Sequence, residues 1–134
     1  MAIVAVDGKQ LFYTRPQRRP GAPTLLLLHG AGGSHLTWPR AIQRLPGMDV
    51  YNLDLPGHGR SAGGAAAIED LGAAVAGFAR LLALQQVCVT GHSMGGAIAL
   101  WLALQKPPWL TSLALIGSGA RLRVSPQILA GLEV

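Results

Sequence analysis

Glycines flank a serine where an apolar run gives way to a helix-forming segment. The five residues have the form G-x-S-x-G, and they are Gly91, His92, Ser93, Met94 and Gly95. Small residues two positions before and after a serine permit a sharp strand-to-helix turn, which pushes the hydroxyl into the open. A hydroxyl held in that way can act as the nucleophile of an acyl transfer. The alternative is that Ser93 only caps the Gly-rich start of a helix.

Backbone amides near this serine could stabilise the negative charge that develops in acyl transfer. Ser93 precedes an expected helix over 94–105, whose dipole and free amides favour an oxyanion. The Met94 N–H is expected to point toward the developing oxyanion. A second Gly-rich stretch, 29–33, follows the most apolar run of the chain. Its glycines let the backbone approach a ligand closely and expose amide groups. Both stretches are therefore candidates for binding an oxyanion.

A third stretch, 54–61, has the pattern D-x-P-G-x-G-x-S. The three motifs, in this order, resemble those of the α/β-hydrolase superfamily, and the resemblance extends from the first residues to about residue 121. It implies that the Ala31 amide is the other oxyanion donor and that His29 packs and forms hydrogen bonds instead of carrying a proton. We interpret Asp54 and His58 as turn-forming and loop-bracing residues, with direct catalysis as the alternative. The residues expected to support the elbow and the loop are Gly91, His92, Gly95, His29 and Gly30.

A serine nucleophile needs a general base, and the base must be oriented by a third group. The resemblance implies that both groups belong to a later half of the fold, so we expect this chain to be the N-terminal half only, with neither base nor acid. The histidines are His29, His35, His58 and His92. His92 adjoins Ser93, but the residue before an elbow nucleophile points elsewhere. For His35 we weigh a rescue role as base against an ordinary place in the loop.

The elements that position these residues alternate between strand and helix. We expect an antiparallel hairpin over 3–6 and 11–14, then strands over 24–28, 50–53, 87–90 and 113–116. Helices are expected over 38–45, 69–84 and 94–105, and another from Ser125 and Pro126 to the end of the chain. The pattern predicts a doubly wound α/β fold with a mostly parallel sheet, interrupted after its sixth strand. Residues 1–134 would form one partial domain, with a lid segment starting at about 121–134.

Composition excludes several other classes of protein. The chain has 134 residues, of which 50% are hydrophobic and 13% charged, so disorder is not expected. Cys88 is the only cysteine, which rules out an intrachain disulfide and suits a small buried apolar residue. The net charge of +5 lacks a focused basic face, because only Arg15, Arg18 and Arg19 cluster, so we expect no nucleic-acid partner. No signal peptide or membrane span is recognisable, and we expect a cytoplasmic protein without cofactor or metal.

Three functional hypotheses remain. The first is a serine hydrolase of a carboxylic ester or related acyl compound, with little or no activity in this chain alone. The second is an inactive remnant or complementation fragment that binds without chemistry. The third is a dinucleotide-binding fold built on Gly30 and Gly32, which lacks the third glycine because His35 occupies that position. In the first two cases the apolar strand 113–116 would lie at an edge, so we expect self-association or pairing with a separate C-terminal half.

Overall fold

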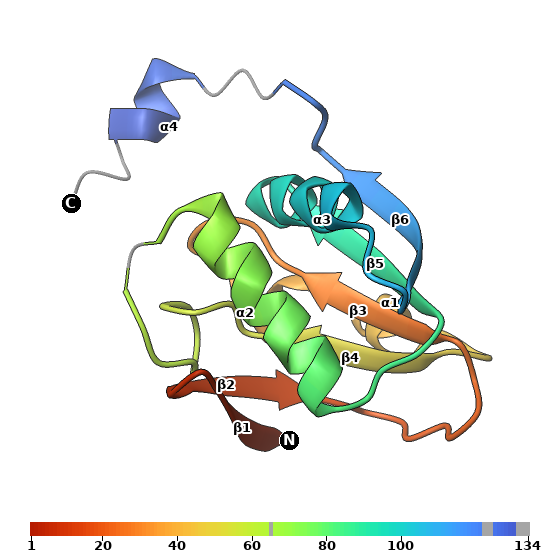
Figure 1. Cartoon of the computed structure of the whole chain (residues 1–134). Helices are drawn as coiled ribbons and strands as arrows, with labels where there is room; N and C mark the ends of the chain where they lie inside the picture. Colours follow the sequence, from red (N-terminus) through yellow and green to blue (C-terminus); the bar gives the residue numbers. More distant parts are fainter. Residues whose placement is uncertain (65, 122–124, 131–134) are drawn as a thin grey trace.

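The computed structural model describes residues 1–64, 66–121 and 125–130 as one six-stranded sheet with helices on both faces (Figure 1). The strands lie in the order β1-β2-β4-β3-β5-β6. Their bounds are β1 Ala2–Val6, β2 Lys9–Thr14, β3 Thr24–Leu28, β4 Asp49–Leu53, β5 Val87–His92 and β6 Leu110–Ile116. The helices are η1 His35–Thr37, α1 Arg40–Gln43, α2 Ile68–Leu81, α3 Met94–Gln105 and α4 Pro126–Ala130.

The sheet is antiparallel at its N-terminal edge and parallel elsewhere. β1 pairs with β2, and β2 with β4, in antiparallel register, whereas β3 pairs with β4 and β5, and β5 with β6, in parallel. Asp7 and Gly8 both have positive φ in the turn between the first two strands, as a two-residue hairpin turn requires. The predicted α/β class and the mixed sheet with an N-terminal hairpin are confirmed.

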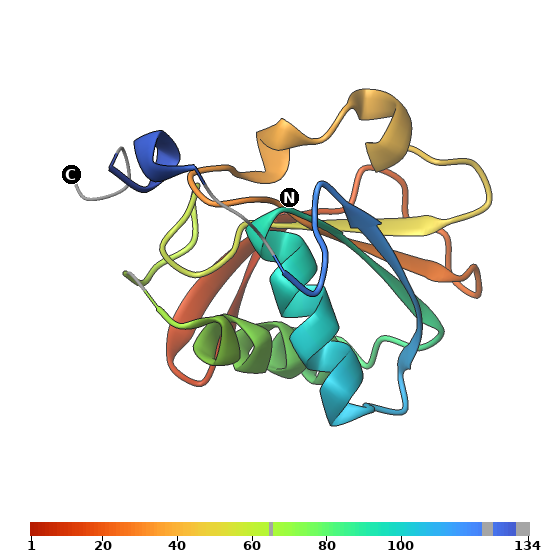
Figure 2. The ribbon, with the colours of Figure 1, turned by 90° about the horizontal axis from the view of Figure 1, so that it is seen from above.

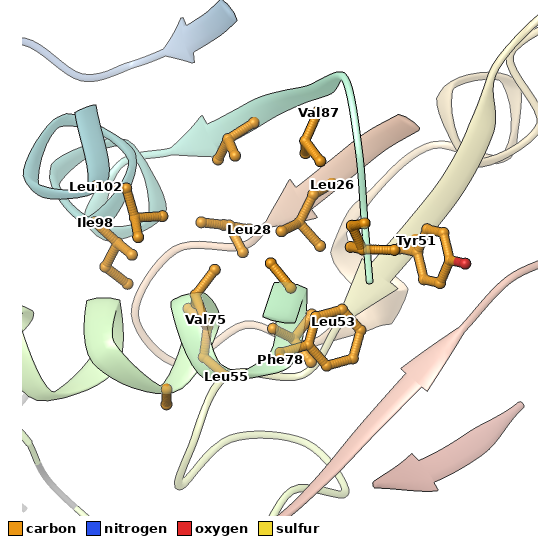
Figure 3. Close-up of a cluster of buried hydrophobic side chains, with 14 of the residues drawn as sticks. Leu26, Leu28, Tyr51, Leu53, Leu55, Val75, Phe78, Val87, Ile98 and Leu102 are labelled. Atoms are coloured by element: carbon orange, nitrogen blue, oxygen red, sulfur yellow. The ribbon is translucent and has the colours of Figure 1, made fainter. Parts of the chain in front are cut away.

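Helices cover the two faces unequally (Figure 2). α2 and α3 pack on one face, where the side chains of Leu26, Leu28, Val75, Phe78 and Ile98 meet in the main core (Figure 3). The short elements η1 and α1 lie on the other face, where Trp38 packs with Leu25, Leu27 and Val50 in a smaller cluster. Among the described residues, no helix combines the length and apolarity that crossing a bilayer demands.

The predicted helix 38–45 is confirmed only over Arg40–Gln43, where α1 lies, and a separate 3-10 turn, η1, precedes it over His35–Thr37. Ser34 caps η1 with a side chain that accepts the Leu36 N–H, and Trp38 then becomes extended with ψ 134°. Pro39 explains the break, since a residue before proline avoids the helical region and proline offers no N–H. The burial of Trp38 fixes this extended residue against the sheet.

Other element boundaries differ by a few residues. α2 ends at Leu81, before the predicted residue 84, because Ala83 takes a positive φ and the Leu84 N–H turns back to the Ala79 carbonyl. β5 continues through Gly91 to His92, so it reaches the serine directly. α4 starts as expected, but the helix predicted to continue over 131–134, and part of the expected lid segment, lie outside the described residues.

Candidate active site

Ser93 lies on a sharp elbow between β5 and α3. Its backbone has φ 51° and ψ −114°, a conformation that L-residues rarely adopt and that functional sites often retain. The side chain makes no capping hydrogen bond to α3. The simple helix-cap interpretation is therefore wrong, because the hydroxyl is not used for that purpose.

Glycines on either side of the elbow are required by close backbone packing. A Cβ on Gly91 would overlap the Gly95 carbonyl, and a Cβ on Gly95 would overlap the Leu28 carbonyl at the end of β3. The turn thus presses the first residues of α3 against both β5 and β3. This crowding is the physical reason for small residues at the second position before and after Ser93.

The end of β6 fixes the elbow through contacts that the sequence did not reveal. The Ser93 N–H donates to the Ile116 carbonyl at 3.0 Å. The Ser118 hydroxyl donates to the Ser93 carbonyl at 2.6 Å. Gly96 leaves the space that the Ser118 side chain occupies. The only sequence signal for this support was the Gly-Ser-Gly run over 117–119, whose position beside the elbow depends on β6 pairing with β5.

The glycine-rich loop after β3 lies directly against the elbow. A Cβ built on Gly30 would lie 3.3 Å from the Ser93 Cβ and 3.0 Å from His92 Nδ1. The loop turns tightly, with the Gly33 N–H donating to the Gly30 carbonyl at 3.1 Å. Ala31 lies at its exposed tip, and Met94 is the first residue of α3. The fold therefore brings together the serine, the loop and the helix N-terminus that the sequence analysis singled out.

His29 is a fully buried bridge between this loop and the turn after β4. Its Nε2 accepts the Leu55 N–H at 3.1 Å, so Nδ1 carries the proton and donates to the Gly30 carbonyl at 2.7 Å. Burial lowers the pKa of His29, and the hydrogen bond to Gly30 offsets part of this shift. A neutral imidazole with both nitrogens occupied orients the loop and is not free to accept a proton from Ser93.

Asp54 organises the turn after β4 and holds His35. The buried Asp54 carboxylate accepts the Arg60 N–H at 2.8 Å and lies 2.9 Å from His35 Nδ1. The Ser61 hydroxyl donates to the Asp54 carbonyl at 2.6 Å. His58 lies in the same turn, with Nδ1 3.0 Å from the Pro56 carbonyl. Each of these polar groups braces the loop itself.

The acid–histidine pair formed by Asp54 and His35 does not lie at the elbow. The His35 ring packs 4.9 Å from the Phe12 ring of β2, and its carboxylate partner follows β4. β3 separates β4 from β5 in the sheet. Neighbouring strands are about 4.8 Å apart, so the pair lies roughly two strand spacings from the strand that carries Ser93. Within the described residues, the hydrogen bonds of the His35 N–H and Nδ1 go to the Asp54 carboxylate and not to the Ser93 hydroxyl.

His92 points away from the Ser93 hydroxyl toward the face that carries η1 and α1. It shares that face with Ile116, its partner in β6, and borders a hollow with Trp38 and Pro39. Within residues 1–64, 66–121 and 125–130, no imidazole or carboxylate hydrogen bonds to the Ser93 hydroxyl, and no three metal-ligating side chains form a cluster. A hollow of about 430 Å³, lined by Arg15 and Asp49, lies at the opposite ends of the strands.

Known proteins match this chain over nearly its whole length. The model of the alpha/beta hydrolase fold family matches residues 23–132. YugF of Bacillus subtilis, an uncharacterized hydrolase, is 35% identical over 134 residues, covering 96% of this chain and 49% of that protein. A 2-succinyl-6-hydroxy-2,4-cyclohexadiene-1-carboxylate synthase of an Enterobacter species is 36% identical over 118 residues, covering 81% of this chain and 42% of that protein.

Solved structures share the fold as well as the sequence pattern. A membrane phospholipase A, described as a bacterial virulence factor, superposes with a TM-score of 0.84 and 32% identity, over 98% of this chain and 44% of that one. The chain therefore belongs to the α/β-hydrolase fold family. It spans about half the length, or less, of the relatives it matches.

Proposed function

We propose that Ser93 is the nucleophile of a serine hydrolase that acts on a carboxylic ester or related acyl compound. The observation that carries the proposal is the elbow, which leaves the Ser93 hydroxyl unused by α3 and sets it against the Gly30 loop. A general base takes the hydroxyl proton as the Ser93 oxygen adds to the acyl carbon, and the carbonyl oxygen becomes an oxyanion. Collapse of the oxyanion breaks the ester bond, and the leaving alcohol takes up the proton from the base. Water then cleaves the acyl-serine ester and releases the acid.

The Ala31 and Met94 amides are the proposed oxyanion donors. Met94 N–H belongs to the free end of α3, where the helix dipole favours negative charge. Ala31 follows Gly30, whose backbone lies against Ser93. Removing one such donor typically lowers the rate by about 100- to 1000-fold. No side chain is needed at either position, which agrees with an alanine and a methionine there.

An ester substrate is supported by the chemistry of a serine elbow and by the name of one similar protein, a phospholipase A. The proposed base and acid are not residues of this chain. Residues 1–134 alone are accordingly expected to show little or no turnover. The bracing of His29 and His35 by other partners supports this expectation, because neither imidazole is available to Ser93.

A binding or complementation role is the second candidate. The observation that favours it is that no described imidazole hydrogen bonds to the Ser93 hydroxyl while the elbow is otherwise intact. In that case the surface around Ser93 would bind a partner or ligand without bond cleavage. The two candidates differ in whether the hydroxyl reacts.

Labelling with a fluorophosphonate separates the candidates. Intact mass analysis of the full-length gene product should show one covalent adduct, because an activated serine attacks phosphorus as it attacks an acyl carbon. Ser93→Ala should abolish the adduct. The matched control Ser112→Ala changes an exposed serine on β6 and should keep it. An unlabelled wild-type protein, or an adduct that survives Ser93→Ala, contradicts the proposal.

A further inference from the structure

A hollow at the end of the sheet away from Ser93 is lined by two loops and by the first residues of β3 and β4. The parallel register places Thr24, Asp49 and Val87 side by side where β3, β4 and β5 begin. The connector between β2 and β3 and the turn between α2 and β5 both lie at this end (Figure 1) and border a hollow of about 430 Å³. β5 has six residues, and at about 3.3 Å per residue the hollow lies roughly 20 Å from Ser93.

One guanidinium group that lines the hollow is already paired. Arg15 donates to both oxygens of the Asp49 carboxylate, with Arg15 Nε 2.7 Å from Asp49 Oδ1. Asp49 is only 5% exposed, and a charge buried to that degree needs such a partner. The same guanidinium lies over the Tyr51 ring, 4.7 Å from its centre. The ion pair therefore fixes one wall of the hollow and adds no net charge to it.

Tyr51 reaches the hollow with an unused hydroxyl. The residue is 6% exposed, and Figure 3 shows its hydroxyl turned away from the neighbouring core side chains. Tyr51 lines the hollow, and its hydroxyl has no hydrogen-bond partner among the residues that the structure describes. Burial raises the pKa of Tyr51, and the positive charges of Arg15 and Arg18 offset part of this shift. The hydroxyl therefore stays protonated at neutral pH and can donate a hydrogen bond.

Arg18 supplies the uncompensated charge of the hollow. It is exposed and, in the part of the chain that the structure describes, it forms no ion pair or hydrogen bond. Its positive charge acts on Tyr51, so the guanidinium and the hydroxyl lie near one another. Gln85 and Gln86 also line the hollow, and their side-chain amides have no partner within residues 1–64, 66–121 and 125–130. The hollow thus combines a free cation with neutral hydrogen-bonding groups.

We infer that this hollow binds a small polar monocarboxylate, such as a sugar acid. The ligand carboxylate accepts hydrogen bonds from Arg18 and from the Tyr51 hydroxyl, because a guanidinium group matches the planar geometry of a carboxylate. The amides of Gln85 and Gln86 bind the hydroxyl groups of the ligand. A single negative charge matches the uncompensated cation, whereas a dianion would be repelled by the buried Asp49 carboxylate. A volume of about 430 Å³ lies in the range of small-molecule sites.

The inference goes beyond the proposed hydrolase chemistry and does not depend on it. The described residues that line the hollow include none from the elbow or from the Gly30 loop. Binding can therefore be measured in the full-length protein carrying Ser93→Ala, in which Ser93 cannot react. A failure of the ester proposal leaves the binding result intact, and a failure to bind the carboxylate leaves the ester proposal intact.

Isothermal titration calorimetry of the full-length Ser93→Ala protein with gluconate tests the site. We expect saturable, stoichiometric binding of gluconate. Glucitol has the same hydroxylated chain without the carboxylate, and we expect it not to bind. Raising the salt concentration should weaken gluconate binding, because the cation that pairs with the carboxylate is exposed to solvent.

Two substitutions locate the binding. Arg18→Gln should weaken gluconate binding about tenfold, because it removes a charge-assisted hydrogen bond. Tyr51→Phe should weaken it about three- to tenfold, because it removes the hydroxyl and keeps the ring. The matched controls are Arg19→Gln and Tyr13→Phe, which change neighbouring groups that do not line the hollow. Both controls should bind gluconate as tightly as the parent protein.

Three results would overturn the inference. They are the absence of saturable gluconate binding, glucitol binding as tight as that of gluconate, and gluconate binding that both Arg18→Gln and Tyr51→Phe leave unchanged. Circular dichroism checks the fold of Tyr51→Phe, whose ring is buried. If that variant is unfolded, Arg18→Gln decides the question, because Arg18 is exposed and its substitution does not disturb the core.

Discussion

Ser93 holds a backbone conformation that costs free energy, and its neighbours show how the fold maintains it. A non-glycine residue at φ 51° and ψ −114° is strained by about 1–3 kcal/mol. Two hydrogen bonds hold this conformation: the Ser118 hydroxyl donates to the Ser93 carbonyl, and the Ser93 N–H donates to the Ile116 carbonyl. Close backbone packing at the neighbouring glycines also restricts the turn. A strained serine whose hydroxyl forms no cap is consistent with selection for reactivity.

Gly95→Ala tests whether close packing maintains the elbow. The added Cβ would overlap the Leu28 carbonyl, so β3 or α3 must shift. We expect a loss of stability of about 1–3 kcal/mol and loss of fluorophosphonate labelling in the full-length protein. Gly64→Ala is the matched control, because a Cβ there meets nothing and φ is ordinary. Thermal melts that rank the two variants equally would contradict the packing argument.

The protonation of His29 predicts a pH dependence of stability. Burial lowers its pKa in the folded state, so below the ordinary value of about 6.5 the unfolded chain binds a proton that the folded chain does not. Above that pH the neutral His29 side chain makes its full contribution to the free energy of unfolding. The free energy of unfolding then falls as the pH drops below the unfolded-state pKa of His29. His29→Gln should melt at a lower temperature at pH 8 and show a smaller decrease between pH 8 and 5. An unchanged slope would contradict a neutral buried imidazole.

The residues of the site could be predicted from the sequence to different degrees. Ser93 and its glycines form a local pattern, and the spacing contains the steric reason for them. Ser118 and Gly96 could not be identified in that way, because their contact joins β6 to the elbow and depends on strand pairing. The binding of His35 by Asp54 was equally hidden, since the two residues are 19 positions apart and meet only when the loop folds over β4.

At the scale of the elements, α2 and α3 approach closely enough that a glycine is required between them. A Cβ on Gly72 would overlap the Trp101 ring. The periodic segments of these helices were predictable, because both carry long apolar patterns without proline. The segment after the Gly30 loop was predictable only in part, because α1 lies inside the predicted range 38–45 but Pro39 separates it from η1.

Gly72→Ala tests the contact between α2 and α3. Alanine is favoured over glycine in a helix by about 1 kcal/mol, so the substitution would stabilise an unobstructed helix. In the wild-type background we expect it to lower the melting temperature, because the new methyl group meets Trp101. In a Trp101→Leu background the same change should be neutral or stabilising. Equal effects in the two backgrounds, measured as a double-mutant cycle, would contradict the contact.

The whole molecule combines a well-packed core on one face with a partly covered sheet on the other. α2 and α3 bury the main core, whereas the second cluster is centred on β3 and β4 and reaches β5 only through Cys88. The predicted sheet and its hairpin could be derived from alternating elements, and the edge position of β6 follows from the strand order. The unequal covering could not be derived, because it depends on how the segment of η1 and α1 packs on the sheet through Trp38 and Ile42.

The geometry at Ser93 is tested most directly by a crystal structure of the full-length protein after reaction with a fluorophosphonate. We predict phosphorus bonded to the Ser93 oxygen, positive φ at residue 93, and a phosphoryl oxygen about 2.7–3.1 Å from the Ala31 and Met94 nitrogens. A Ser93 within regular helical backbone, or a phosphoryl oxygen turned away from both amides, would contradict the account.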